Sequence, residues 1–467
     1  MRERTIVVGA GFAGLACAHA LARAGREVVA FEGGPRAGGV VGSVCEGGFL
    51  FERAAHTILA GSPAFRRVVD ELGLSGRLVC ATPAARTRWL WHRGRLRALP
   101  ASPPALVATD LLSWRAKRAL LTEPLRRFVP PADHEPEPTL GAFLDERIGR
   151  EASRLLAGAF VRGVHAAELD ELGARSAFPR LWELATRHGS LVRGALARAR
   201  TRPAPLAGPD LRRHALVSFP GGLQELVEAL ARELGPRLRL GARVVGLERL
   251  GSRWLVRTAD GLGHPARAVV LACPAPAAAR LLAAEVPREL SARALGVRHA
   301  AVTLVGLGFA PGTLDALPEG FGFLVPPGAA GHVGAAPRAL GTIFVTNLFP
   351  DRAPRGARSV SSFYRAADVE GLDDAALARV AEADLALALG TAAPRAATVH
   401  VERWSEVIPR HAPGHAAFVD GLRRTLRERA HGLHVAGAWV DGVSVEQVLT
   451  SGRRAAEEVL GDTREQA

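Results

Sequence analysis

A glycine-rich turn near the start of the chain constrains the fold more than any other feature. Residues 4–9 read as a buried strand, the helix that follows runs to about Arg23, and residues 26–32 form a second strand ending in Glu32. The turn at residues 9–14 has the GxGxxG pattern of a dinucleotide-binding βαβ unit. We therefore expect an α/β chain with a Rossmann-like parallel sheet and a dinucleotide bound at its edge.

Each glycine of this turn has a separate task. Gly9 permits the tight turn, Gly11 lets the backbone approach a pyrophosphate, and Gly14 lets helix and strand pack closely. Free N–H groups at the start of the helix attract the diphosphate, and Glu32 is placed to accept hydrogen bonds from ribose hydroxyls. The expected cofactor-binding residues of this unit are Gly9, Ala10, Gly11, Phe12, Ala13, Gly14 and Glu32.

The residues after the second strand narrow the choice of cofactor. Residues 33–39 read GGPRAGG, which resembles the RxGG extension of flavin amine oxidases and their relatives. The resemblance implies FAD, with Arg36 facing the diphosphate and a glycine pair passing beneath it. The alternative for Arg36 is an ordinary solvated loop arginine. The resemblance adds Gly33, Arg36, Gly38 and Gly39 to the expected cofactor-binding residues.

The length and the apolar pattern limit the class of protein. A chain of 467 residues exceeds what one hydrophobic core usually organises, so two or three domains are expected. No run reaches the roughly 18 apolar residues of a membrane-spanning helix, and no signal peptide precedes the first strand. We expect a cytoplasmic protein. The four cysteines are widely separated without metal-ligand spacing, and no metal site is expected.

The formal net charge of +14 raises the question of a polyanionic partner. Lys117 is the only lysine, and the arginines are scattered among apolar positions. The aromatic interleaving of a single-strand binding groove is missing, and so is any recognised DNA-reading motif. We expect no nucleic-acid partner, and a basic face against anionic lipid at the inner side of the cell membrane is the favoured alternative.

Five later segments carry a second resemblance. In order and spacing they resemble the oxygen-dependent protoporphyrinogen oxidase family, in its bacterial form, over nearly the full length of the chain. The segments are 95–112 (RLRALPASPPALVATDLL), 218–234 (SFPGGLQELVEALAREL), 320–326 (GFGFLVP), 403–415 (RWSEVIPRHAPGH) and 433–459 (LHVAGAWVDGVSVEQVLTSGRRAAEEV).

This resemblance implies three structural parts. They are a discontinuous FAD-binding domain (1–60, 215–285 and 405–467), an antiparallel-sheet substrate domain (61–85 and 286–404) and a helical, membrane-facing subdomain (86–214). Helical periodicity places Leu181, Trp182, Leu184, Leu191 and Val192 on one face. A bundle that turns this face toward a protein core is the alternative to membrane contact. Alternation at 297–309 and 341–348 predicts antiparallel strands.

The resemblance also implies further residues around FAD. The loop 54–57 would pass beside the flavin, Val244 would contact the adenine, and Trp404 would lie near the isoalloxazine ring or serve as a core residue. The segment at Gly437 would return the C-terminal part of the chain to the first βαβ unit. Residues 443–445 would contact the pyrimidine end of the isoalloxazine ring at the start of a helix. These additional cofactor-binding residues are Ala54, Ala55, His56, Thr57, Val244, Trp404, Gly437, Val443, Ser444 and Val445.

The implied reaction is oxidation of protoporphyrinogen IX by six electrons, with three O₂ reduced to H₂O₂. No side chain is expected to act as a catalyst, because the chemistry takes place on the flavin. A cationic or polar group should anchor the substrate propionates, and the candidates are His56, Arg53 and Arg162, although His56 could instead only bind backbone. The loops 52–56 and 163–168 depart from the family pattern on the substrate side.

Several alternatives stay open at this point. Coproporphyrinogen III oxidation differs only in the number of carboxylates on the substrate. A flavin amine oxidase would need a lysine near the flavin and an aromatic cage, and this chain has only Lys117 and Tyr364. A polyene desaturase would share the first FAD segment alone, and a flavin-free scaffold would lack bound cofactor. The oligomeric state is also open, with a homodimer among the alternatives.

Overall fold

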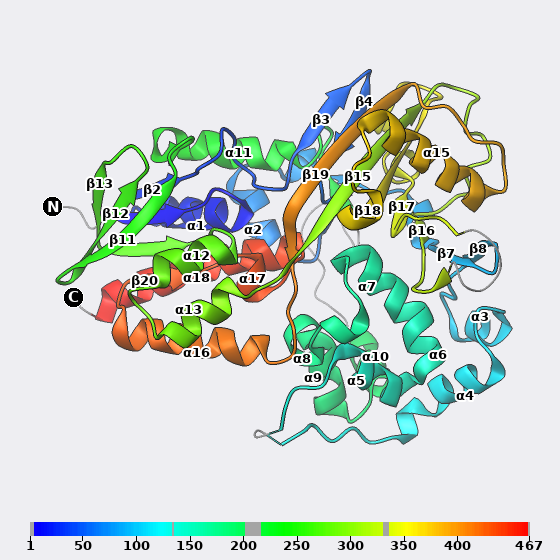
Figure 1. Cartoon of the computed structure of the whole chain (residues 1–467), viewed down its shortest axis with the longest axis horizontal. Coiled ribbons are helices and arrows are strands. Elements are labelled where there is room, and N and C mark those ends of the chain that lie inside the picture. Colours follow the sequence, from blue (N-terminus) through cyan, green and yellow to red (C-terminus); the bar gives the residue numbers. More distant parts are fainter. Residues whose placement is uncertain (1–3, 133–134, 201–215, 330–335, 466–467) are drawn as a thin grey trace.

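Three distant segments of the chain meet in one parallel sheet. The computed structural model describes residues 4–132, 135–200, 216–329 and 336–465 (Figure 1). The strand order of this sheet is β10-β2-β1-β14-β20, and every neighbouring pair is parallel. Its strands are β1 (Thr5–Val8), β2 (Val28–Phe31), β10 (Leu238–Arg239), β14 (Ala268–Leu271) and β20 (Leu433–Val435). The expected Rossmann-like parallel sheet is confirmed.

Helices cover both faces of this sheet. Val7 of β1 faces one core, whereas Ile6 and Val8 face the other, as the alternation of side chains along a strand requires. The first face packs against α1 (Phe12–Arg23), α2 (Pro63–Glu71), α11 (Gln224–Leu234) and α18 (Val445–Glu465). The second packs against α12 (Ala275–Leu282), α13 (Arg288–Leu295), α16 (His415–Arg429) and α17 (Ala438–Asp441).

Three smaller antiparallel sheets accompany the parallel sheet in the described part of the chain. The first contains β11 (Val244–Leu250), β12 (Arg253–Thr258) and β13 (Gly263–Ala266). The second is the hairpin of β3 (Ser43–Glu46) and β4 (Phe49–Glu52), and the third joins β5 (Ile58–Leu59), β6 (Val79–Cys80) and β9 (Leu216–Ser218).

A seven-stranded, mostly antiparallel sheet forms the upper right of Figure 1, in the order β19-β15-β18-β17-β16-β7-β8. Helix α15 (Asp374–Leu389) packs against it around a core that includes Val305, Phe309 and Tyr364. The strands are β7 (Trp89–His92), β8 (Arg95–Ala98), β15 (His299–Phe309), β16 (Gly322–Leu324), β17 (Gly341–Ile343), β18 (Arg358–Arg365) and β19 (Thr398–Pro409). The expected antiparallel sheet is therefore present.

Two expectations about secondary structure were wrong. The segment 89–98 forms the hairpin β7–β8 in this sheet rather than a helix, because Arg93 and Gly94 both adopt positive φ and make a two-residue turn. Residues 345–348 form the short helix α14 (Val345–Leu348) instead of extending β17. The expected domain boundaries stay a prediction. Strand β19 continues across the boundary that was expected between residues 404 and 405.

Helices dominate from Pro103 to Arg200, at the lower right of Figure 1. They are α3 (Pro103–Ala108), α4 (Trp114–Thr122), α5 (Leu140–Ile148), α6 (Arg150–Ala152), α7 (Gly158–His165), α8 (Ala174–Ala177), α9 (Pro179–His188) and α10 (Leu191–Arg200). Leu181, Trp182 and Leu191 pack inside this part, so the face predicted from periodicity is directed inward. The remainder of the predicted helical segment, 201–214, lies outside the described residues.

The closest helix contact against the glycine-rich turn is made by α18. A Cβ atom at Gly452 would lie 2.0 Å from the carbonyl oxygen of Ala13 in α1. A glycine at this position lets the two helix backbones touch, which joins the C-terminal segment to the first βαβ unit.

We predict that Gly452→Ala lowers the free energy of unfolding by about 3 kcal/mol, because the methyl group must push α18 away from α1. Gly461→Ala on the same helix is the matched control, since a Cβ there meets nothing within 4 Å. The control should be neutral or raise stability by about 1 kcal/mol through helix propensity. Denaturant unfolding of both variants measures the difference, and equal stabilities would contradict the close contact.

Candidate active site

A cavity of about 1110 Å³ begins where the parallel strands end. It is lined by Val8 at the end of β1, Phe31 at the end of β2 and Ala272 just after β14. From there it continues to the inner face of the seven-stranded sheet and to helices α7 and α9. Ligands of open α/β sheets bind at this carboxyl edge. The cavity therefore joins a dinucleotide end to a second, apolar end.

The glycine-rich turn has the geometry that its sequence predicts. Gly9 has φ +101°, and a Cβ atom there would lie 2.7 Å from the carbonyl oxygen of Ala272. A Cβ at Gly14 would lie 1.8 Å from the carbonyl oxygen of Gly9, so helix and strand could not pack with a larger residue. A Cβ at Gly11 would meet nothing within 4 Å, which leaves room for a ligand against the backbone.

Glu32 organises the turn from the end of β2. Its two carboxylate oxygens accept hydrogen bonds from the backbone N–H groups of Ala10 and Gly34, each at 2.8 Å. A carboxylate has about four acceptor positions, so two remain for ribose hydroxyls. Glu32 also lines the cavity, together with Gly9, Gly11, Phe12, Ala13, Gly33, Gly38 and Gly39 from the predicted set. Ala10 and Gly14 lie behind this surface.

Arg36 is directed toward its own loop. Its guanidinium donates to the carbonyl oxygens of Ala37 at 3.3 Å, Val41 at 3.2 Å and Gly39 at 2.6 Å, and it is not among the cavity-lining residues. It braces the double-glycine bend, at which Gly38 donates to Ala10 at 2.8 Å. A direct contact between Arg36 and the diphosphate stays a prediction.

The loop at 53–57 and the strand β19 line the cavity together. The indole of Trp404 donates a hydrogen bond to the carbonyl oxygen of Arg53 at 2.9 Å. The Arg53 guanidinium lies 5.7 Å from the Trp404 ring centroid and binds Glu402, with Nε 2.5 Å from a carboxylate oxygen. Ala54, Ala55, His56, Thr57 and Trp404 all line the cavity. Arg53 also lines it, with its charge already paired.

His56 is a neutral group in this structure. Burial lowers the pKa of His56 to about 4, so the imidazole carries no charge at neutral pH. Its Nδ1 lies 3.1 Å from the carbonyl oxygen of Ala54, and its ring meets Phe363 edge-on at 5.6 Å. Its Nε2 is buried and has no hydrogen-bond partner among the described residues. With Nδ1 donating to the Ala54 carbonyl, the neutral His56 can therefore only accept a hydrogen bond at Nε2, and it lacks the positive charge expected of a carboxylate anchor.

Arg162 is directed elsewhere. Its guanidinium donates to the carbonyl oxygen of Pro326 at 3.2 Å and lies 3.5 Å from Glu168. The cavity wall includes its neighbours Gly163, Val164, His165 and Ala166, but not Arg162 itself. The two loops that depart from the family pattern thus both reach the cavity, while this candidate anchor does not.

The C-terminal segment forms the wall between the two ends of the cavity. Gly437 follows β20, its N–H donates to the Ser451 hydroxyl at 2.8 Å, and it lines the cavity with Val443, Ser444 and Val445. Helix α18 starts at Val445, so its N-terminus, where N–H groups are free, faces the cavity. Val244, from the far side of the parallel sheet, also lines the cavity.

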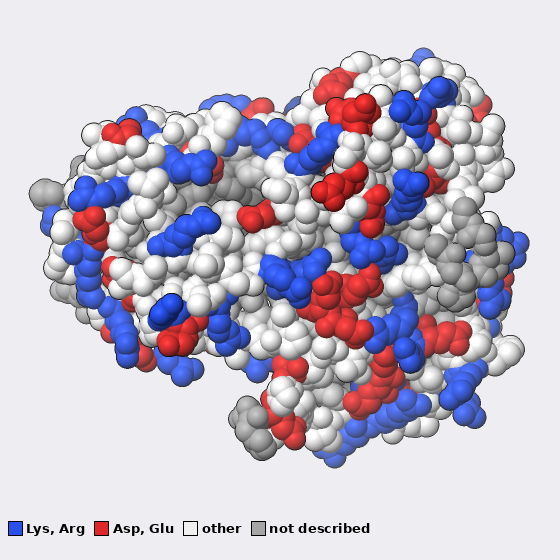
Figure 2. Space-filling view, in the orientation of Figure 1, with Lys and Arg blue, Asp and Glu red and all other residues white. Residues whose placement is uncertain are grey.

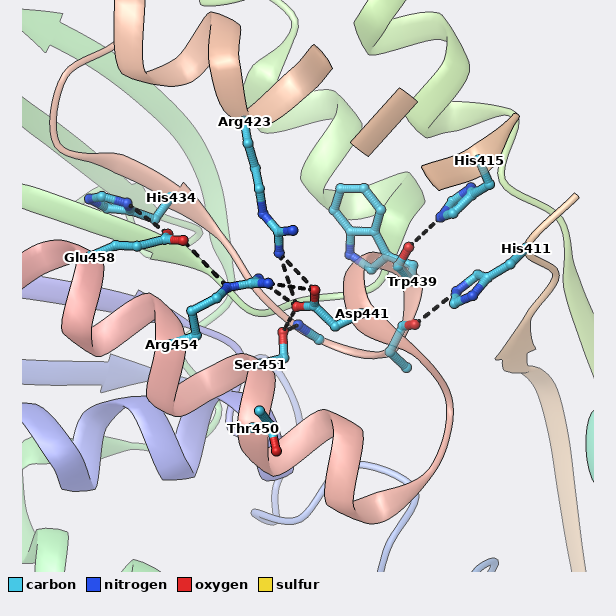
Figure 3. A network of polar contacts seen from close by, with 12 residues as sticks. His411, His415, Arg423, His434, Trp439, Asp441, Thr450, Ser451, Arg454 and Glu458 are labelled. Carbon is cyan, nitrogen blue, oxygen red and sulfur yellow. Dashed lines mark hydrogen bonds and ion pairs between the residues drawn. The ribbon is translucent and has the colours of Figure 1, made fainter. Parts of the chain in front are cut away.

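A polar network holds this segment in place (Figure 3). Asp441 accepts hydrogen bonds from Arg423 at 2.9 Å, from Arg454 at 2.6 Å and from Ser451. On the other side, His411 and His415 stack at 4.5 Å and bind the carbonyl oxygens of Ala438 and Trp439. Burial lowers the pKa of His411 to about 3, so this imidazole is neutral. The turn is thus fixed from both sides.

Sequence reasoning missed part of the wall. Phe160 and Val164 of α7, and Phe178, Arg180 and Leu181 around the start of α9, line the apolar end of the cavity. Helical periodicity gave no sign of a cavity at the start of α9. Only the packing of α9 beside α7 brings these residues together.

The single lysine and the single tyrosine of the chain lie away from the cavity. Lys117 donates to the carbonyl oxygen of Val107 at 2.7 Å and lies 4.5 Å from the Trp114 ring centroid. Tyr364 is buried and donates to Asp384 at 3.2 Å. Neither side chain can therefore contact a ligand in the cavity.

Comparison with known proteins places the chain in a family. Residues 12–460 match the family described as flavin containing amine oxidoreductase, and the chain belongs to that family. It is an oxidoreductase that uses FAD, in keeping with the open backbone at Gly11 and the free acceptor positions on Glu32.

Particular relatives are porphyrinogen-oxidising enzymes. The chain is 32% identical to protoporphyrinogen oxidase of Macaca fascicularis, covering 99% of each chain. It is 26% identical to coproporphyrinogen III oxidase of Bacillus subtilis (strain 168), covering 98% of each. A solved structure of an Exiguobacterium sp. 255-15 protein assigned as a protoporphyrinogen oxidase has the same fold, with a TM-score of 0.81 at 22% identity and 99% coverage of both chains.

We predict that Asp441→Asn lowers the free energy of unfolding by about 2 kcal/mol, because Arg423 and Arg454 lose the charge that both share. Asp420→Asn on α16 is the matched control, since Asp420 is exposed and has no ion pair among the described residues. Denaturant unfolding at neutral pH measures both. If Asp441→Asn unfolds like the control, the network does not stabilise the turn.

Proposed function

We propose that this protein oxidises protoporphyrinogen IX to protoporphyrin IX, with six electrons passing to three O₂ and three H₂O₂ formed. The observation that carries the proposal is the cavity, which continues past the Gly437 segment into an apolar space beneath the seven-stranded sheet. Its walls there include Val302, Leu304, Leu340, Phe363 and Ile408. A flat macrocycle with apolar edges suits such a space, and the 32% identical primate relative is a protoporphyrinogen oxidase.

The chain's own residues would bind and orient rather than catalyse. Bound FAD supplies the electron acceptor for carbon–hydrogen oxidation and passes the electrons to oxygen. The glycine turn, Glu32 and Val244 would hold the ADP part, while Trp404 and residues 443–445 would border the flavin. The apolar walls would exclude water from the reacting carbon. No side chain is proposed as a general base, because imine–enamine shifts within the substrate let its protons leave to solvent.

Amine oxidation is the rival that shares this fold. The notable difference lies in the cavity, which contains neither lysine nor tyrosine among the described residues, because Lys117 and Tyr364 are held elsewhere. The lysine and the cage tyrosine typical of amine oxidases therefore have no counterpart among the described residues that line the cavity. Coproporphyrinogen III remains the second candidate substrate, favoured by the Bacillus relative.

We predict that the purified, FAD-loaded protein oxidises protoporphyrinogen IX in air faster than coproporphyrinogen III, with three H₂O₂ formed per porphyrin. Porphyrin fluorescence and a peroxide assay on the same sample measure both quantities. A faster reaction with coproporphyrinogen III would assign the protein to the second candidate. No reaction with either, with FAD bound, would contradict the porphyrinogen proposal and direct the search to amines and polyenes.

We also propose that the helical part contacts a membrane surface. Trp114, Leu125 and Val129 are exposed to 72%, 83% and 73%, which is unusual for large apolar side chains. Exposed arginines lie between them, at positions 115, 118, 126 and 127. Apolar side chains mixed with arginine suit an interface of anionic lipid. No described helix is both long and apolar enough to span a bilayer.

We predict that the wild-type protein sediments with vesicles of phosphatidylcholine and phosphatidylglycerol, and that Leu125→Glu/Val129→Glu abolishes this binding. The reason is that two carboxylates oppose both burial in the interface and the anionic surface. Leu262→Glu is the control, because Leu262 is also exposed, to 58%, but lies far along the chain between β12 and β13. Equal binding of both variants would contradict a membrane contact at this surface.

A further inference from the structure

The apolar end of the cavity is poor in free positive charge. Arg53 is paired with Glu402, and burial lowers the pKa values of His56 and His165 to about 4 and that of His299 below its ordinary value. These groups therefore offer no unpaired cation at neutral pH. Arg243 and Arg280 also line the cavity, but at its dinucleotide end, beside Gly33 and on α12.

Arg180 differs from the other basic groups at the apolar end of the cavity. It is exposed, lines the cavity, and has no hydrogen bond or ion pair among the described residues. Its backbone is fixed by Pro179, the first residue of α9. Its neighbour Phe178 packs against His165 at 5.2 Å and Phe160 at 6.4 Å, so the wall beneath the arginine is aromatic and held in place.

The surroundings of Arg180 suit an anion that is attached to an apolar body. The side chain emerges from the first turn of a ten-residue helix, where free N–H groups add positive potential. Ala177, Phe178 and Leu181 line the cavity on either side of it. Figure 2 shows Arg and Lys side chains interspersed with Asp and Glu over the face in view.

We infer that Arg180 binds a carboxylate of the substrate at the rim of the cavity while the apolar body lies inside. The inference rests on the proposed porphyrinogen substrate, whose propionates supply the carboxylates. Arginine offers two parallel N–H donors that match a carboxylate. This contact orients the macrocycle with its propionate edge toward α9 and its opposite edge toward the sheet. It assigns the anchoring role, expected of His56, Arg53 or Arg162, to another residue.

The test is equilibrium binding of protoporphyrin IX and of its dimethyl ester to the FAD-loaded protein, followed by quenching of tryptophan fluorescence. The ester keeps the macrocycle but removes both charges. We expect Arg180→Ala to weaken binding of the diacid about tenfold, as for a charge-assisted hydrogen bond. Arg180→Lys should retain part of the affinity, and binding of the ester should be the same in wild type and variant.

Arg187→Ala is the matched control, because Arg187 lies on the same helix, is 73% exposed, pairs with Glu183 and does not line the cavity. It should bind both ligands like the wild type. Unchanged diacid binding in Arg180→Ala, or an equal loss for diacid and ester, would overturn the inference. The wild-type protein could prefer the diacid through Arg180 and still fail to oxidise protoporphyrinogen. That result would support the carboxylate contact and count against the proposed reaction.

Discussion

The pairing of β14 with both β1 and β20 is the constraint on which the rest of the structure depends. Through it, the glycine-rich turn after β1, the loop after β14 and the Gly437 segment after β20 end at one sheet edge. Each supplies a wall of the cavity. Since neighbouring parallel strands share a fixed register, the three walls cannot shift independently. The position of the cavity at this sheet edge is therefore set by backbone pairing.

The parts of the fold that sequence predicted well are local. The turn at 9–14 combines strand, turn, helix and acidic residue within about thirty residues, and its geometry can be read from glycine sterics alone. The hairpin at 89–98 was missed because each strand has only four residues, which is too short a run to distinguish strand alternation from a helical pattern. Arg180 was missed because the aromatic wall beside it includes Phe160 and His165 of α7, which sequence does not place next to α9.

Residue type was a poor guide to charge in the cavity. His56 and Arg53 are basic side chains at the expected place, yet burial keeps the first neutral and Glu402 pairs the second. An ionisable group in an apolar wall loses its charge or acquires a partner, because desolvation costs more than a weak contact returns. A free cation can persist only where water still reaches it. That condition is met at the rim, where Arg180 lies.

The place of β20 in the chain order has a consequence for biosynthesis. On the ribosome, β1, α1 and β2 emerge before β14 and β20 and can form their βαβ unit, but the last wall of the cavity waits for residues 433–449. Until then the edge of β14 is unpaired and the floor of the cavity is open. A nascent chain thus carries a finished nucleotide motif with nothing to enclose its ligand. The cavity can therefore enclose a ligand only after the Gly437 segment has been synthesised.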